Sequence, residues 1–176
     1  DRAACRWMLD DVNDNIVLFL QCAIFTILKV RDVYPGSSFA RHRILGHACW
    51  WSTCPEVEEY VVGLCESLRP ATCRGRLHRL CLSIWRGCQG THVASAEPSE
   101  RFSIEFTGEP TRSLESLPPD ALSQALACTL TRLEMSLAAL GAPPSAESID
   151  AEVPWSVIVE TREVSAVGAI RDEALG

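Results

Sequence analysis

Hydrophobic residues recur along the chain at two spacings, which predict where helices and strands lie. The most apolar run is Ile16–Leu28 (IVLFLQCAIFTIL), inside a segment that we predict to be a helix from about Met8 to Val33. Because this helix is apolar on nearly all sides, we expect other elements to enclose it. Pro35-Gly36 ends the helix, and residues 35–53 are predicted to form an irregular loop.

Two further segments have apolar residues three and four positions apart, the spacing of one helix face. The second helix is predicted to begin at Pro55 and to end at Pro70. The third begins at Pro118-Pro119-Asp120 and is capped by Gly141. The predicted buried faces are Val57, Tyr60, Val61, Leu64 and Leu68 in the second helix, and Leu122, Leu126, Leu130, Leu133, Leu137 and Leu140 in the third.

Three segments alternate apolar and polar residues, as strands with one buried face do. They lie at 80–85, 101–106 and 155–159. We expect the first two to form an antiparallel hairpin across the polar connection Gly87–Glu100. The order helix, helix, two strands, helix, strand predicts a single α+β domain, with three helices packed on a small antiparallel sheet.

The composition and charge narrow the classes of function. The chain has 176 residues, 47% of them hydrophobic and 22% charged, which is typical of one globular domain. A net charge of −7 argues against broad binding to nucleic-acid backbones, which requires a basic face. A basic stretch is formed by Arg74, Arg76, His78, Arg79 and Arg86. Binding of nucleic acid would require more aromatic residues among these basic residues than Trp85 alone. We therefore interpret the stretch as a solvated strand edge that discourages aggregation.

The cysteines indicate a reducing compartment. The chain has nine, an odd number at irregular spacing, which argues against a disulfide framework. Cys22, Cys65, Cys81 and Cys128 lie in apolar periodic stretches, where free cysteine packs as a small hydrophobic residue. We therefore expect the cytosol or the nucleus. The apolar run of the first helix has 13 residues, fewer than the roughly 20 that span a membrane, so a buried core helix is the preferred interpretation.

The sequence carries no motif of a known catalytic type. It has no phosphate-binding glycine loop, no GxSxG and no HExxH. His47, Cys49 and Cys54 come nearest to a metal cluster, but they lack a second ligand pair at zinc-finger spacing. A thiol- or metal-dependent enzyme built from distant residues is the alternative. We expect no enzyme activity, metal or cofactor. We expect instead an adaptor that binds another protein.

Four motifs, in order and at matching spacing, resemble those of HORMA-domain proteins. They are Val30–Pro35 (VRDVYP), Cys54–Tyr60 (CPEVEEY), Glu100–Phe106 (ERFSIEF) and Trp155–Glu163 (WSVIVETRE). Within the family, the acid of VRDVYP and the Thr-Arg-Glu after the last strand are most similar to the accessory subunit of DNA polymerase zeta. The resemblance predicts a HORMA-like core at residues 8–163 and a short tail at 164–176.

The resemblance implies a role in binding rather than catalysis. HORMA proteins trap a short peptide of a partner, which adds a strand to the sheet beneath a C-terminal segment called the safety belt. In the polymerase zeta subunit the peptide belongs to the catalytic subunit, and a second translesion polymerase also binds. The resemblance therefore implies an adaptor in translesion synthesis and DNA repair. Its expected location is the nucleus, with the cytoplasm as a further one, and no direct binding to nucleic acid or membranes is implied.

Four residues fall on family positions that have roles. Tyr60 falls on a tyrosine that lines the peptide site, although its helical phase also allows core packing. Asp32 and Arg41 fall on charged positions through which HORMA domains pair with one another. Their alternative interpretations are a capped helix end and a solvated loop. Arg132, on the third helix, is a further candidate for this pairing surface.

The tail is shorter than the family's safety belt. Residues 164–176 also lack the aromatic and aliphatic residues expected of a closing belt. This suggests an alternative function, a belt-less HORMA protein that acts only by dimerising with other HORMA domains. A spindle-checkpoint or meiotic HORMA adaptor is a further alternative within the family.

Overall fold

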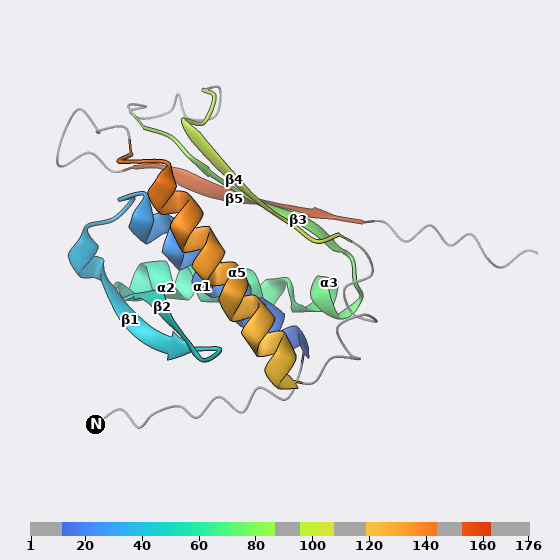
Figure 1. The fold of residues 1–176 in the computed structure, drawn as a ribbon. Helices are drawn as coiled ribbons and strands as arrows, with labels where there is room; N and C mark the ends of the chain where they lie inside the picture. Colours follow the sequence, from blue (N-terminus) through green and yellow to red (C-terminus); the bar gives the residue numbers. More distant parts are fainter. Residues whose placement is uncertain (1–11, 87–95, 108–118, 144–152, 163–176) are drawn as a thin grey trace, which may run out of the picture.

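The computed structural model describes residues 12–86, 96–107, 119–143 and 153–162 (Figure 1). Helices and strands follow one another along the chain in the order expected for an α+β fold, with additional short elements. They are α1 (Val12–Val30), the 3-10 turn η1 (Gly36–Ser38), β1 (Phe39–Ile44), β2 (His47–Ser52), α2 (Pro55–Ser67), α3 (Arg69–Cys73), β3 (Leu77–Ile84), β4 (Glu100–Glu105), α5 (Pro119–Ala139) and β5 (Trp155–Thr161).

Helix α1 is the centre of the core. Every residue from Asn15 to Leu28 is buried, which confirms that other elements enclose this apolar helix. Helices α2 and α5 and strand β2 pack against it. By length and composition α1 could cross a membrane, but 78% of its most apolar 18-residue stretch is buried inside the protein. Packing in the core therefore explains its apolar surface. The predicted residues 8–11 of this helix lie outside the described residues.

The main sheet has three antiparallel strands in the order β4-β3-β5. The predicted hairpin of β3 and β4 is confirmed, with Leu80 opposite Ile104. Strand β5 pairs with the other side of β3, where Leu80 is opposite Val159. Figure 1 shows the sheet lying along one side of the helices. The apolar side chains of β4 and β5 pack against the core, as the alternation predicted.

The prediction of an irregular loop at residues 35–53 is wrong. Strands β1 and β2 form a second, two-stranded antiparallel sheet in which Arg41 is opposite Trp50. Their turn is Leu45-Gly46, with φ of 52° and 75°. The three residues of β1 from Arg41 to Arg43 are all exposed. The strand therefore lacks the alternation by which strands are recognised in a sequence.

Strand β3 is the central strand, so the interpretation of its arginines as a solvated edge is wrong. Arg79 pairs with Glu105 on β4 at 3.0 Å and with Glu160 on β5 at 3.4 Å. Arg86 pairs with Glu100, and its side chain is only 5% exposed. Arg79 of β3 therefore links the three strands to one another.

The boundaries of the other two helices follow the prediction with two exceptions. Pro70 does not end the helical region, because it occupies the first turn of α3, where proline's missing N–H costs no hydrogen bond. Helix α5 buries Leu122, Leu130 and Leu137 as predicted, but Leu140 lies just beyond its end and is 61% exposed. Gly141 has φ of 75°, which is consistent with the predicted glycine cap.

Candidate functional site

Strand β5 is an edge of the sheet, because β3 is its only strand neighbour among the described residues. The N–H of Trp85 donates to Pro154 O at 2.9 Å, and the N–H of Arg162 donates to Arg76 O at 2.7 Å. Even-numbered residues of this segment therefore face β3. Successive residues of an antiparallel strand direct their backbone groups to opposite sides. The N–H and C=O groups that face away from β3 belong to Trp155, Val157, Val159 and Thr161.

Aromatic side chains lie at the start of this edge. The Tyr60 ring, on α2, meets the Trp155 ring edge to face, with centroids 5.4 Å apart and an interplanar angle of 82°. The indole N–H of Trp155 donates a hydrogen bond of 2.8 Å to the hydroxyl of Tyr34. Tyr60 is 53% exposed, so the expectation that it packs in the core is wrong. It lies instead on the surface that borders the open strand edge.

Arg41 is not the solvated loop residue of the alternative interpretation. Its Nη2 lies 2.5 Å from Oε1 of Glu134 on α5. Its guanidinium lies 4.0 Å from the centroid of the Trp50 ring, and the indole N–H of Trp50 also donates to Glu134 at 3.2 Å. This cluster fastens the β1–β2 hairpin to α5. The side chain of Arg41 nevertheless stays 40% exposed.

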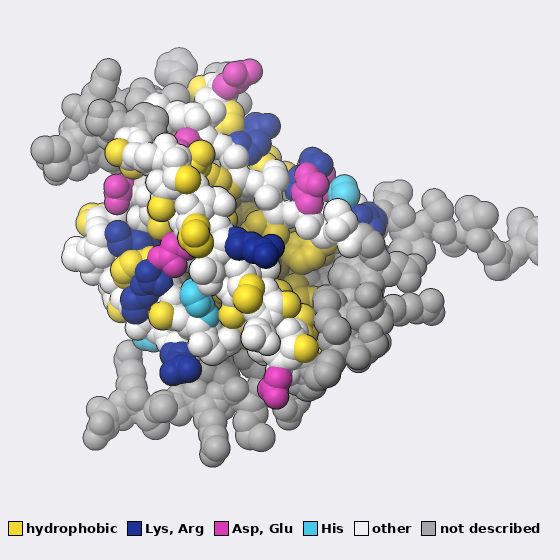
Figure 2. Space-filling model, in the orientation of Figure 1, with side chains coloured by type: hydrophobic (Ala, Val, Ile, Leu, Met, Phe, Trp, Pro, Cys, Tyr) yellow, Lys and Arg dark blue, Asp and Glu magenta, His cyan; other side chains and the backbone are white. Residues whose placement is uncertain are grey.

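The other two pairing candidates, Asp32 and Arg132, are exposed. Asp32 follows α1 with φ of 46°, a conformation that aspartate tolerates better than most residues, and its N–H donates to Lys29 O at 3.3 Å. The helix-end interpretation of Asp32 therefore fits. Arg132 is exposed on α5, two residues before Glu134. Figure 2 shows this face of the protein, on which charged side chains of both signs lie among scattered hydrophobic ones.

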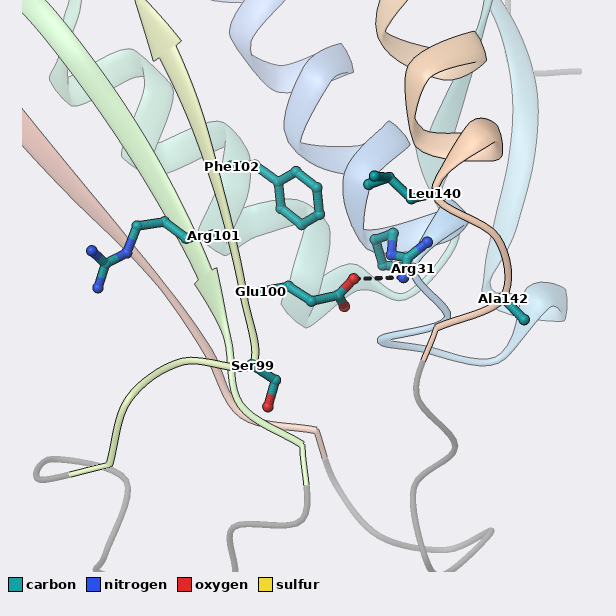
Figure 3. Close-up of a pocket in the computed structure, with 7 residues that line it drawn as sticks. All are labelled: Arg31, Ser99, Glu100, Arg101, Phe102, Leu140 and Ala142. Carbon is teal, nitrogen blue, oxygen red and sulfur yellow. Dashed lines mark ion pairs between the residues drawn. The ribbon is translucent and has the colours of Figure 1, made fainter.

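An open cleft of about 420 Å³ lies between the start of β4 and the end of α5. In Figure 3 the Phe102 ring and Leu140 lie near an ion pair of Arg31 with Glu100, while Arg101 points away from it. The two charged atoms are 2.5 Å apart, and Arg31 Nη1 also donates to Gly141 O at 2.8 Å. The sequence did not single out this cleft, because its residues are distributed over three elements.

Buried thiols lie between α1, α2 and β2. A hydrogen bond with Cys49 and burial raise the pKa of Cys22, and the same hydrogen bond lowers the pKa of Cys49. Burial raises the pKa of Cys65 to about 12. No group of three or more His, Cys, Asp and Glu side chains in the described part of the chain could hold a metal ion. The thiols therefore pack as small apolar groups.

Comparisons with known proteins identify structural neighbours but no sequence relatives. No protein-family model and no curated protein sequence matches the chain. A solved structure of the mitotic checkpoint complex matches with a TM-score of 0.65 and 16% identity, over 93% of this chain and 82% of that one. Caenorhabditis elegans HTP-2 bound to a HIM-3 closure motif matches with a TM-score of 0.62 and 14% identity, over 92% and 76%. The neighbours are HORMA-domain proteins. The fold is HORMA-like.

Within the HORMA-like fold, the four sequence motifs contact one another. Arg31 of the first motif pairs with Glu100 of the third. Tyr34 of the first accepts the hydrogen bond from Trp155 of the fourth. Tyr60 of the second packs against the same Trp155. The motifs therefore hold together α1, α2, β4 and β5, and Trp155 joins two of them at the open edge.

Proposed function

We propose that the protein is an adaptor that binds an extended peptide of a partner protein along the β5 edge. The supporting observation is the exposed Tyr60 ring packed on Trp155 at the start of a strand with four outward-facing backbone positions. A peptide strand can hydrogen-bond to these groups while its side chains contact the aromatic pair. Two of the similar HORMA structures hold partner peptides called closure motifs, which supports the same mode of binding.

The proposed partner is the catalytic subunit of a polymerase zeta-like translesion polymerase. The support for this choice is the resemblance of VRDVYP and of Thr161-Arg162-Glu163 to the accessory subunit. The protein would then serve translesion synthesis and DNA repair in the nucleus, and would bridge to a second translesion polymerase. It would act without enzyme activity or a cofactor, and without direct contact with DNA or membranes.

Peptide titration tests this function. Isothermal titration of the full chain with a proline-containing peptide from a polymerase zeta catalytic subunit should give saturable binding. Tyr60→Ala should weaken it roughly tenfold or more, because aromatic side chains dominate such contacts. Met135→Ala is the matched control, since Met135 is an exposed apolar residue, 68% accessible, on a different helix. If Tyr60→Ala and Met135→Ala bind the peptide with equal affinity, Tyr60 is not part of the site. If neither the wild type nor the variants bind the peptide, the proposed function is contradicted.

The alternative function is pairing with another HORMA domain through the α5 face. Arg132 is exposed on α5, Arg41 is exposed and pairs with Glu134 of this helix, and Asp32 is exposed after the end of α1, which favours this alternative. Mass photometry across a concentration series should then detect dimers that Arg132→Glu or Asp32→Lys weakens. A monomer at every concentration, alone and with a candidate HORMA partner, would contradict it. A spindle-checkpoint or meiotic role differs from the repair role in its partner, so the identity of the protein that copurifies with this chain distinguishes these roles.

A further inference from the structure

The charged side chains beside the β5 edge are unevenly distributed. The Trp155 end of the edge lies beside the first two turns of α2. There Glu56 and Glu59 are exposed and make no ion pair with any described residue. Glu56 is one turn before Tyr60 and therefore shares its helix face. This part of α2 thus carries two exposed acids, of which Glu56 shares the helix face of Tyr60.

The Thr161 end of the same edge is rich in arginine. The backbone bond from Arg162 to Arg76 places these two residues together just beyond β5, while the Arg162 guanidinium reaches across β3 and donates to Phe106 O at 3.0 Å. Arg74 is exposed two residues before Arg76. Among the described acids, Glu160 of β5 is already paired with Arg79. The exposed charges near the two ends of the edge thus differ in sign, with Glu56 near Trp155 and Arg74 near Thr161.

Helix stability explains only one of these two acids. An acidic residue in the first helical turn interacts favourably with the helix dipole, and this accounts for Glu56. Glu59 is the fifth residue of α2, beyond the turn where the effect is largest. Another acid of this segment, Glu58, accepts a hydrogen bond of 2.9 Å from the Trp51 indole. Glu59 has no such partner among the described residues, although it neighbours the exposed Tyr60.

The outward face of the strand adds an apolar contact. Ile158 is 57% exposed, and its side chain points to the face opposite that of Val157 and Val159. A strand added at the edge would place every second side chain on this face, next to Ile158. The opposite set of side chains would face Tyr60 and Glu56.

We infer that the peptide bound at this edge carries lysine or arginine at the end beside Trp155, where Glu56 and Glu59 lie. An apolar residue follows next to Ile158, and the end beside Thr161 is neutral or acidic. This inference rests on the proposed function and specifies its partner chemistry. Such a charge pattern would also set the direction in which the peptide lies, because reversing it would bring like charges together at both ends.

A randomised peptide library tests the inference without a known partner. The full chain is immobilised and used to select from a displayed library of twelve-residue peptides at low salt. We expect an enriched sequence with lysine or arginine at one end and an apolar residue near the middle. An enriched sequence without basic residues would overturn the inference and leave peptide binding intact. A selection without enrichment would contradict the proposed function itself.

Charge reversal then identifies the acids. For a selected peptide, Glu56→Lys with Glu59→Lys should weaken binding roughly tenfold, since two exposed attractions become repulsions. Glu56→Gln with Glu59→Gln should have a smaller effect of about threefold and guards against misfolding by added charge. Glu97→Lys, at an exposed acid before β4, is the control for net charge. Equal losses of affinity in Glu97→Lys and in the α2 variants would overturn the assignment to Glu56 and Glu59. Raising the salt concentration should weaken peptide binding more in the wild type than in the α2 variants.

Discussion

Arg31 Nη2 lies 2.5 Å from Glu100 Oε1, and the two side chains are 2% and 13% exposed. The second oxygen of Glu100 pairs with Arg86 Nε at 3.3 Å. One carboxylate therefore compensates two guanidinium groups that are almost completely removed from water. The Arg31–Glu100 pair joins the end of α1 to the start of β4.

Neutralising Glu100 should therefore destabilise the fold strongly. Glu100→Gln leaves two arginines buried beside each other without a counter-charge, and we expect a loss of about 3–5 kcal/mol. Glu105→Gln is the matched control on the same strand, where the side chain is 48% exposed, and should cost less than about 1 kcal/mol. Urea unfolding followed by circular dichroism measures both. Similar losses in the two variants would show that the buried pair has no special role.

A charge swap distinguishes a role of Arg41 within the fold from a role in pairing with a partner domain. Arg41→Glu should loosen the β1–β2 hairpin, because it repels Glu134 and loses the contact with Trp50. Adding Glu134→Arg restores an ion pair of reversed polarity within the protein. If Arg41 acts only in the fold, the double variant should recover most of the lost thermal stability and keep any dimerisation. If Arg41 instead binds a HORMA-domain partner, stability should recover while dimer formation, measured by mass photometry, should not.

Hydrogen exchange should show the alternation along β5. The amides of Ser156, Ile158 and Arg162 face β3 and should exchange slowly, whereas those of Trp155, Val157 and Val159 should exchange faster. Nuclear magnetic resonance of labelled protein resolves the individual amides. Saturating peptide should slow the second set by at least about tenfold. Protection of the first set alone, with peptide bound, would place the peptide elsewhere.

Buried Cys65 should make stability fall in alkaline solution. Burial raises its pKa from 9.0 to about 12, so the unfolded chain loses the thiol proton at a lower pH than the folded protein. The contribution of the protonated Cys65 thiol to the free energy of unfolding is complete below pH 9. It is lost between about pH 9 and pH 12, by up to about 1.4 kcal/mol per pH unit. Cys65→Ala should reduce this slope in urea titrations at pH 8 to 11. Cys73→Ala, at an exposed thiol, should leave the slope unchanged.

The long elements could be predicted because their side chains repeat with the period of the structure. Helix α1 is almost entirely apolar from Ile16 to Leu28, and the alternation Phe102, Ile104, Phe106 identified β4. The β1–β2 hairpin was missed for two physical reasons. Residues Arg41 to Arg43 of β1 are consecutive exposed residues, and the turn Leu45-Gly46 lacks the Asn-Gly or Asp-Gly pair typical of such turns.

The candidate site depends on contacts that the sequence pattern does not encode. The helical period placed Tyr60 with the buried residues of α2, but the neighbouring Trp155 belongs to a strand 95 residues later and leaves the ring half exposed. Likewise, β3 is the central strand because its backbone pairs with both β4 and β5, and no local pattern in the sequence reveals that β5 is its second partner. Periodicity identifies which face of an element is apolar, but not which element covers it.

The outward-facing backbone of β5 also has a practical consequence for handling the protein. An edge that accepts a partner's strand accepts the same strand of another copy, and no charge protects the stretch from Val157 to Val159. Concentrated protein should therefore associate edge to edge in vitro. Coexpression with a bound peptide would occupy this edge and keep the protein dispersed during purification.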